Sequence, residues 1–365
     1  MPKFNDNNHS TFNGKNIKLE IYGASHAEKI GVKIKGLKKG DVFKEDKLKA
    51  FMDRRKSQKT AYSTSRGEKD EVEFIKGVKG GKIISKTLIA EIKNNTMRSK
   101  DYGDGVVKPR PSHADYVGVM KYGDKFDYRG GGKFSGRMTA PMCIAGGIFK
   151  QLLAKSGITI NAYIKSIGDV MGKGYQDVDV EKFDFSTTEN AFPLLDESVK
   201  EEMLKLTEKV RSEGDSVGGT IECVVKGLPV GLGEFMFDGI ENLISNLVFS
   251  VPAVKGIEFG LGFKFASAYG SSANDEFYFD ENGKVKTYTN NNAGINGGIS
   301  NGMPITFRVA VKPTPSISIE QKTINLKTNE NDVIKIEGRH DACIVPRVAS
   351  VIEAVTAIAI YDLTY

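Results

Sequence analysis

The chain has 365 residues, of which 39% are hydrophobic and 27% are charged, and 52 lysines and arginines against 46 acidic residues give a net charge of +6. This length is enough to bury a large core, and the absence of an apolar run near 20 residues argues against a membrane-spanning protein. Three widely spaced cysteines exclude a disulfide framework or a CxxC zinc site and indicate buried thiols.

The N-terminal segment 1–16 is rich in Asn, Lys and Ser and has no apolar stretch of the kind that signal peptides carry. We therefore expect a flexible tail on a cytoplasmic protein. Beyond it, β-branched and aromatic residues at every second position predict strands at 17–22, 220–226, 256–268 and 306–312.

Apolar residues at helical spacing predict helices at 45–55, 142–155, 197–213, 242–250 and 342–363. The stretch 169–196 is acidic and irregular, which indicates a surface excursion. No linker divides the chain and strands do not alternate regularly with helices. We therefore predict that residues 17–365 form a single α+β domain with antiparallel strands as its main scaffold.

Three of the four histidines lie in short polar motifs: Gly-Ala-Ser-His at 23–26, Pro-Ser-His-Ala-Asp at 111–115 and Gly-Arg-His-Asp at 338–341. Imidazole titrates near neutral pH, so histidines in turn-forming settings suggest one folded site that performs proton chemistry. For any one of them, a hydrogen-bonded core or surface histidine is the commoner outcome. His9 lies in the tail and is assigned no role.

A glycine-rich run at 128–137 carries the basic residues Arg129, Lys133 and Arg137. It does not match the Walker pattern, but glycines let backbone N–H groups approach an anion while the basic side chains add charge. An ordinary glycine hairpin with solvated basic residues explains the run equally well. The second glycine cluster, 291–302, has no basic residues and is typical of a tight loop.

Two further motifs are ambiguous from the sequence alone. Lys-Pro-Thr-Pro-Ser at 312–316 suits a phosphate or a ring carbonyl, and it also suits an ordinary strand exit. The pair Arg54–Arg55 suits carboxylates, although a helix C-terminus attracts positive charge in any case. The lack of GxGxxG gives no support to a Rossmann nicotinamide site, and scattered lysines do not favour nucleic acid.

Taken together and in this order, the motifs resemble those of the chorismate synthase family from about residue 17 to residue 363. The family's Gly-Glu-Ser-His-Gly, Arg-Arg, Arg-Pro-Gly-His-Ala-Asp and Arg-Gly-Gly-Gly motifs are matched at 23–27, 54–55, 110–115 and 129–139. Further matches stand at 215–219, 252–256, 297–302, 312–316 and 338–341. The resemblance implies a single catalytic domain over 17–365, with antiparallel β-sheets forming a sandwich core surrounded by helices, and a homotetramer.

The resemblance also implies a reaction, the 1,4-elimination of phosphate from 5-enolpyruvylshikimate-3-phosphate to give chorismate on reduced FMN, with NADPH as a candidate reductant. By position, His26 would protonate the departing phosphate and His113 would stabilise the anionic reduced flavin by proton donation. Asp341 would assist removal of the ring proton through flavin N5. Ser25 and Ser135 would support the two histidines and the flavin.

The remaining roles implied by the resemblance concern binding, and no metal is implied. The flavin would be held by Lys133, Ser135, Ala253, Gly297, Lys312, Thr314, Ser316 and Arg339. The substrate's acidic groups would be held by Arg55 and Arg137.

Several positions depart from the family pattern. Ala24 replaces a glutamate, Lys133 an arginine, Phe134 a serine and Pro315 a serine, and no arginine stands near Ala61. Lysine keeps the charge of arginine but loses its paired hydrogen bonds, so we expect altered flavin contacts. The missing arginine near Ala61 predicts weak NADPH binding. Two other functions stay open: an NAD(P)H-dependent flavin reductase, and a non-catalytic protein that binds anions or nucleic acid.

Overall fold

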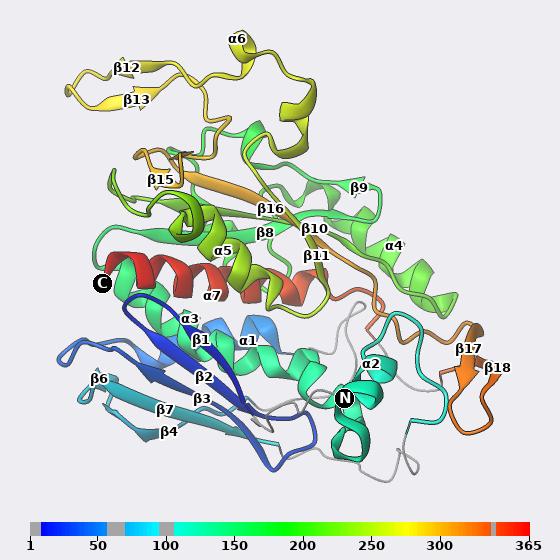
Figure 1. Ribbon diagram of the computed structural model, residues 1–365. Helices are drawn as coiled ribbons and strands as arrows, with labels where there is room; N and C mark the ends of the chain where they lie inside the picture. The colour runs from blue at the N-terminus through cyan, green and yellow to red at the C-terminus, as the bar shows by residue number, and fades with distance from the viewer. Residues whose placement is uncertain (1–8, 57–69, 95–105, 337–340) are drawn as a thin grey trace.

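The computed structural model describes residues 9–56, 70–94, 106–336 and 341–365 (Figure 1). Two five-stranded antiparallel sheets form its outer layers. The first sheet has the order β1 (His9–Asn13), β2 (Lys18–Gly23), β3 (Lys29–Lys35), β7 (Thr87–Lys93), β4 (Glu73–Lys76). The second has the order β11 (Val254–Phe259), β16 (Ile305–Val311), β10 (Gly219–Lys226), β8 (Thr159–Ile167), β9 (Val170–Met171).

Long helices fill the space between the two sheets: α1 (Glu45–Arg55), α3 (Thr139–Ala154), α5 (Ile240–Phe249) and α7 (Val345–Thr364). Nearly every residue of α7 is buried, as expected of a helix that is apolar on all sides. The α3 and α7 backbones approach closely, since a Cβ atom at Gly146 would lie 2.4 Å from Ala354 Cα.

Shorter strands and helices complete the fold. The two-stranded pairs are β5 (Val78–Lys79) with β6 (Lys82–Ile83), β12 (Phe277–Phe279) with β13 (Val285–Thr287), β14 (Ile295–Asn296) with β15 (Ile299–Ser300), and β17 (Gln321–Asn325) with β18 (Glu330–Ile334). The other helices are α2 (Asp115–Tyr122), α4 (Lys200–Ser212) and α6 (Gly270–Ala273). Within the described ranges, no helix is long and apolar enough to cross a membrane.

The predicted α+β class with antiparallel sheets is confirmed, but the predicted order of the layers is wrong. Helices do not surround a β-sandwich; they lie between the two sheets. The physical reason is the composition of α7, whose apolar side chains cover its whole circumference and need partners on every side. Cys143, Cys223 and Cys343 are buried and free, as predicted, and burial raises the pKa of Cys143 to about 12.

The predicted flexible tail is also wrong for its described part, residues 9–16. Strand β1 pairs with β2 from His9 opposite Tyr22 to Asn13 opposite Lys18. The chain then turns, and the backbone N–H groups of Lys15, Asn16 and Ile17 donate to the Asp362 carboxylate at 2.9, 2.8 and 2.9 Å. Polar side chains suit an edge strand, so the composition of this segment does not exclude a sheet.

The predicted strand 256–268 is correct only in its first part. Strand β11 ends at Phe259, and residues 262–267 form a 3₁₀ helix. Gly260 and Gly262 adopt φ values of +55° and +54°, which turn the chain out of the sheet. Of the predicted helices, 45–55 coincides with α1, and 142–155 lies within one residue of the C-terminal end of α3.

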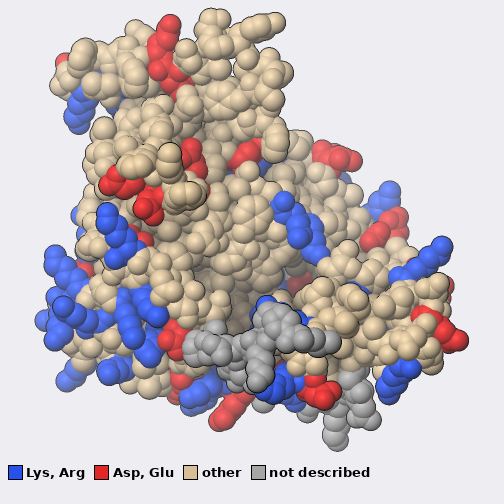
Figure 2. Space-filling view, viewed as in Figure 1, with Lys and Arg blue, Asp and Glu red and all other residues tan. Residues whose placement is uncertain are grey.

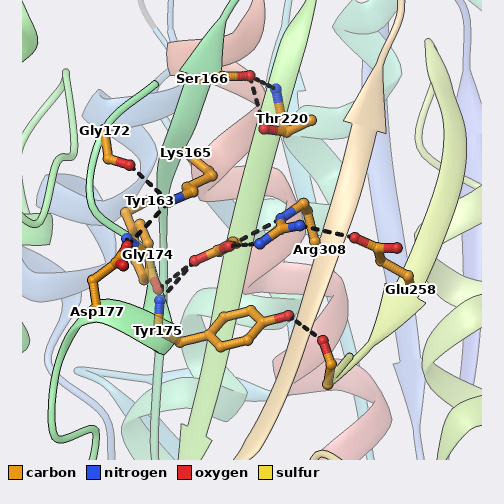
Figure 3. A network of polar contacts seen from close by, with 12 residues as sticks. Tyr163, Lys165, Ser166, Gly172, Gly174, Tyr175, Asp177, Thr220, Glu258 and Arg308 are labelled. Atoms are coloured by element: carbon orange, nitrogen blue, oxygen red, sulfur yellow. Dashed lines mark hydrogen bonds and ion pairs between the residues drawn. The ribbon is translucent and has the colours of Figure 1, made fainter. Parts of the chain in front are cut away.

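The excursion 169–196 covers the outer face of the second sheet. Tyr175, Phe185 and Leu195 pack there with Tyr163 and Val224 of the sheet. Beneath them lies a row of polar residues on four neighbouring strands, which we call the sheet network: Tyr163, Glu222, Arg308 and Glu258, together with Tyr175 from the excursion (Figure 3).

Every member of the sheet network is hydrogen-bonded. Glu222 is fully buried and accepts from Tyr163 Oη at 2.9 Å, the Tyr175 backbone N–H at 2.8 Å and Arg308 Nε at 2.9 Å. Arg308 also donates to Glu258 at 2.9 Å, and Tyr175 Oη donates to the Gly260 carbonyl at 2.7 Å. The network therefore fixes the excursion onto the sheet.

Candidate active site

A turn of three glycines, residues 130–132, brings two of the predicted histidines together. A Cβ atom at Gly130 would lie 2.4 Å from His26 Cε1, and one at Gly131 would lie 3.5 Å from His113 Nε2. The Ser25 backbone N–H donates to the Gly132 carbonyl at 3.1 Å, which ties the two loops together. The two imidazoles, 87 positions apart in sequence, therefore lie against neighbouring residues of one turn.

The glycines of this turn are required by its geometry. Gly130, Gly131 and Gly132 have φ values of +58°, +83° and +53°, in the region that side chains rarely adopt. A Cβ atom at Gly132 would lie 1.9 Å from the Asp127 carbonyl oxygen. Side chains here would move the turn away from both histidines.

His113 is oriented by a carboxylate. Its Nδ1 lies 2.7 Å from Asp115 Oδ1, and the His113 side chain is only 16% exposed. Arg110 binds the same carboxylate through Nε at 2.7 Å and Nη2 at 2.8 Å. With Nδ1 held by Asp115, Nε2 is the nitrogen that faces the glycine turn.

Asp115 is held in its charged form by these contacts. Burial of the carboxyl favours protonation, but hydrogen bonds from Arg110 and His113 outweigh it and hold the pKa of Asp115 well below its usual range. An ionised Asp115 can only accept at its oxygens, which favours a proton on Nδ1 of His113; Arg110 Nη2 also lies 3.1 Å from this nitrogen.

Ser25 and His26 stand in the turn that follows β2. Asn94, just after β7, holds this turn through Nδ2, which donates to the carbonyls of Ala27 at 2.7 Å and Ala24 at 3.3 Å. Nδ1 of His26 is buried. The His26 ring therefore has a defined place beside the glycine turn.

The two arginines predicted to hold the substrate converge on one carboxylate. Arg55 Nη2 donates to Asp70 Oδ2 at 2.6 Å, and Arg137 Nη1 donates to Asp70 Oδ1. We call these three residues the arginine clamp. The Asp70 side chain is 1% exposed, and burial is again outweighed, here by the charges of Arg55 and Arg137, which lower the pKa of Asp70.

Asp341 is joined to the arginine clamp through Arg347 of α7. Arg347 Nη1 donates to Asp341 Oδ2 at 2.6 Å, and Arg347 Nε donates to the Arg55 backbone carbonyl at 3.0 Å. On the other side of the clamp, Arg137 Nε donates to Asn94 Oδ1 at 3.1 Å. Polar contacts therefore run from Asp341 to the turn that carries His26.

Two of the predicted flavin ligands, Lys312 and Ser316, contact residues of the loop that carries His113, and Thr314 stands between them in sequence. Lys312 Nζ donates to the Ser112 carbonyl at 2.6 Å, and Ser316 Oγ accepts from Arg110 Nη1 at 3.1 Å. The Lys312 backbone N–H donates to the Ala253 carbonyl at 2.9 Å, which adds a fourth predicted ligand to the group.

This group of residues fits an anionic ligand with hydrogen-bonding atoms. Thr314 Oγ1 is buried and has no hydrogen-bond partner among the described residues. Burial and the neighbouring Lys255 lower the pKa of Lys312, as expected for a cation that lacks a counter-charge. A flavin carrying a phosphate would supply both the missing partner and the missing charge.

Lys133 and Ser135 lie at the end of the glycine turn. Ser135 Oγ accepts from the Arg137 backbone N–H at 3.3 Å, and the Ser135 Cβ would lie 3.7 Å from a Cβ atom at Gly131. Lys133 Nζ lies 5.7 Å from the centre of the Tyr122 ring. Phe134 packs with Tyr122 and Phe126 at the same edge, at ring distances of 6.4 and 6.1 Å.

Two predicted site residues do not join this group. Gly297 lies in the β14–β15 hairpin, which precedes β16, whereas Lys312 follows β16; seven residues of strand, about 20 Å, separate them. A flavin contact from Gly297 of the same chain is therefore not supported. Arg339 lies outside the described residues, as does His340.

Sequence reasoning assigned no role to four residues that organise this site: Asp70, Asn94, Arg110 and Asp115. Asp115 stands two positions after His113, a spacing that could have indicated a carboxylate for the imidazole. No local pattern marks Asp70 or Asn94, because their partners come from distant segments.

The comparisons with known proteins agree with one another. The sequence profile described as chorismate synthase matches residues 17–365. Chorismate synthases from Dehalococcoides mccartyi and Thermococcus gammatolerans are 41% and 42% identical, each over 96% of this chain and over 95% and 96% of their own lengths. A crystal structure of chorismate synthase superposes with a TM-score of 0.72 at 25% identity, covering 96% of this chain and 92% of that one.

Proposed function

The chain belongs to the chorismate synthase family, and we propose that His26, His113 and Asp341 handle the protons of its reaction. Its activity is that of the family: the elimination of phosphate from 5-enolpyruvylshikimate-3-phosphate to give chorismate, which requires a reduced flavin. Nothing favours the flavin reductase or the non-catalytic binding protein. The cytoplasmic location expected from the sequence stays a prediction.

The observation that carries the proposed roles is the glycine turn 130–132, against which both imidazoles lie. His26 protonates the departing phosphate, and general acid catalysis of this kind is typically worth about 10²–10⁴-fold. His113, oriented at Nδ1 by Asp115, would donate from Nε2 toward the turn in its doubly protonated form. Asp341, held by Arg347, would assist the removal of the ring proton.

Positive charge on both sides of the turn supports the proposed binding roles. Arg55 and Arg137 hold the acidic groups of the substrate, and Lys312, Thr314, Ser316 and Ser135 hold the flavin together with Lys133 and Ala253. Burying several anionic groups without partners would cost several kcal/mol each, which explains why basic residues surround the site. When bound, a reduced flavin supplies the electronic part of the elimination.

We assign FMN as the flavin, because Lys312 and the hydroxyls of Thr314 and Ser316 suit a single phosphate and a ring carbonyl. NADPH binds weakly at best, since the position expected to carry an arginine near Ala61 carries none.

Anaerobic incubation with chemically reduced FMN and 5-enolpyruvylshikimate-3-phosphate tests this proposal. Phosphate and chorismate are expected to form in equal amounts, and Lys312→Met is expected to weaken FMN binding about tenfold or more. Lys205→Met on α4, where Lys205 is 71% exposed, is the matched control and should bind FMN normally. A folded, flavin-bound protein that forms neither product would contradict the proposal.

The exposed aromatic residues support the homotetramer expected from the family. An arm of residues 262–288 projects from the second sheet (Figure 1), and Figure 2 shows both tan surface and charged side chains in that region. Four of the five most exposed aromatic side chains among the described residues lie on the arm: Phe263 (85%), Tyr269 (81%), Phe279 (75%) and Tyr288 (70%). Apolar patches of this kind usually mark protein contacts.

We propose that this arm contacts other copies of the chain. Light scattering should give a tetramer for the wild type and a smaller species for the double variant Phe263→Ser/Phe279→Ser. A monomeric wild type, or a double variant that stays tetrameric, would contradict this assignment.

A further inference from the structure

The carboxylate of Asp70 is divided between two arginines from different parts of the chain. Oδ2 accepts from Arg55 at the end of α1 at 2.6 Å, and Oδ1 accepts from Arg137 beyond the glycine turn. All three side chains are buried: Arg55 is 2% exposed, Arg137 9% and Asp70 1%. Asp70 therefore fixes the distance and direction between the two guanidinium groups.

Without Asp70 the two guanidinium groups would not stay together. Like charges a few ångströms apart repel strongly when water is excluded, and each buried charge also needs a partner. One carboxylate binds both arginines and so keeps their guanidinium groups side by side. Guanidinium groups suit the acidic groups of the substrate, because they donate paired hydrogen bonds to carboxylates and phosphates.

The clamp also stands between the two ends of the proposed proton-handling site. Arg55 is reached from Asp341 through Arg347, and Arg137 is connected through Asn94 to the carbonyls beside His26. A displacement of either arginine would therefore also displace the groups on both sides of the substrate. No other carboxylate among the described residues is shown binding both arginines.

From this placement we infer that Asp70 is a positioning residue of the elimination: it holds Arg55 and Arg137 where the acidic groups of 5-enolpyruvylshikimate-3-phosphate bind. Asp70 itself does not contact the substrate. The inference rests on the function proposed above.

The test compares Asp70→Asn with Asp70→Glu and with a control, using the wild-type reaction as reference. Asparagine keeps the shape of Asp70 but turns an NH₂ group toward one arginine, so KM for the substrate should rise about 10- to 100-fold, with a smaller fall in kcat. Asp70→Glu keeps the negative charge, so its KM should lie between those of the wild type and Asp70→Asn. Asp53→Asn on α1, where Asp53 is 42% exposed and pairs with Lys56, should change KM by less than about twofold.

Flavin affinity and the thermal midpoint distinguish positioning from general damage. Both should stay close to wild type in Asp70→Glu, and this variant decides the question if Asp70→Asn does not fold. An active wild type whose Asp70 variants keep a normal KM would overturn the inference alone. A lower KM in Asp70→Asn would also overturn it, because Asp70 would then compete with the substrate. An inactive wild type would defeat the proposed function and this inference with it.

Discussion

Two of the buried networks of arginine and carboxylate groups in the described part of the chain are built in opposite ways. In the sheet network, Tyr163, Glu222, Arg308 and Glu258 stand opposite one another on paired strands. In the arginine clamp, Arg55, Asp70 and Arg137 come from a helix end, a loop and the segment after the glycine turn. The first is held by backbone register, whereas the second depends on the side chains alone.

This difference separates stability from function. The sheet network pairs its single arginine with two carboxylates and fixes a surface excursion, so its hydrogen bonds stabilise the fold. The clamp binds two arginines to one carboxylate beside the proposed site. Substitutions in the first region should lower stability and spare the reaction, whereas substitutions around the second should impair the reaction itself.

The largest expected effect is on turnover, from His113→Ala. Loss of the imidazole should lower kcat about 10²–10⁴-fold while the thermal midpoint stays within a few degrees of wild type. Steady-state kinetics and thermal unfolding measure the two quantities. Met120→Ala, which truncates a 57% exposed side chain on α2, is the control and should keep normal turnover.

On the stability side, Glu222→Ala should have the largest effect. It leaves Arg308 without its main partner, and breaking a buried ion pair costs about 3–5 kcal/mol in the free energy of unfolding. Glu201→Ala, at an 80% exposed position, should cost less than about 1 kcal/mol. The comparison of the two networks fails if Glu222→Ala lowers kcat as strongly as His113→Ala does.

Asp115 should contribute a pH-dependent part of stability. Its pKa in the folded protein lies well below the unfolded value, so its contribution is present above about pH 4–5 and is lost as the pH falls through the folded pKa. Asp115→Asn should therefore lower the free energy of unfolding by about 1–2 kcal/mol at pH 7, with a smaller difference near pH 2. Denaturant titrations at several pH values measure this, and a difference that grows toward low pH would contradict it.

The smallest effect is expected from Tyr175→Phe. It removes only the hydrogen bond from Tyr175 Oη to the Gly260 carbonyl, which is worth about 0.5–1.5 kcal/mol. Urea unfolding measures the change, and Tyr288→Phe, at a 70% exposed position, is the control. A loss of turnover without a loss of stability would show that the excursion serves the site directly.

Part of the fold follows from local sequence patterns. Helix α1 is predicted residue for residue, because acidic residues open it and Arg54 and Arg55 close it. Strand β8 was not predicted, since it is buried on both faces and shows no alternation. The order of the layers could not be predicted either, because an apolar helix surface does not say which elements cover it.

The part of the candidate site that is marked by sequence motifs was predictable. His26, His113 and the glycine turn were expected to meet and lie side by side. Asp70 and Asn94 were missed because their roles arise only when distant segments meet. The role of Gly297 came from the family alone and stays a prediction, and its hairpin lies at the far end of β16 from Lys312.

The hydrogen bonds between the Asp362 carboxylate and the backbone N–H groups of residues 15–17 link positions up to 347 apart in sequence. On a ribosome that adds about 5–20 residues per second, Asp362 appears roughly 20–70 seconds after its partners. During that time, the segment between β1 and β2 lacks these hydrogen bonds. These contacts are therefore expected to form only after Asp362 has been synthesised, and removal of its carboxylate, as in Asp362→Ala, would loosen residues 15–17.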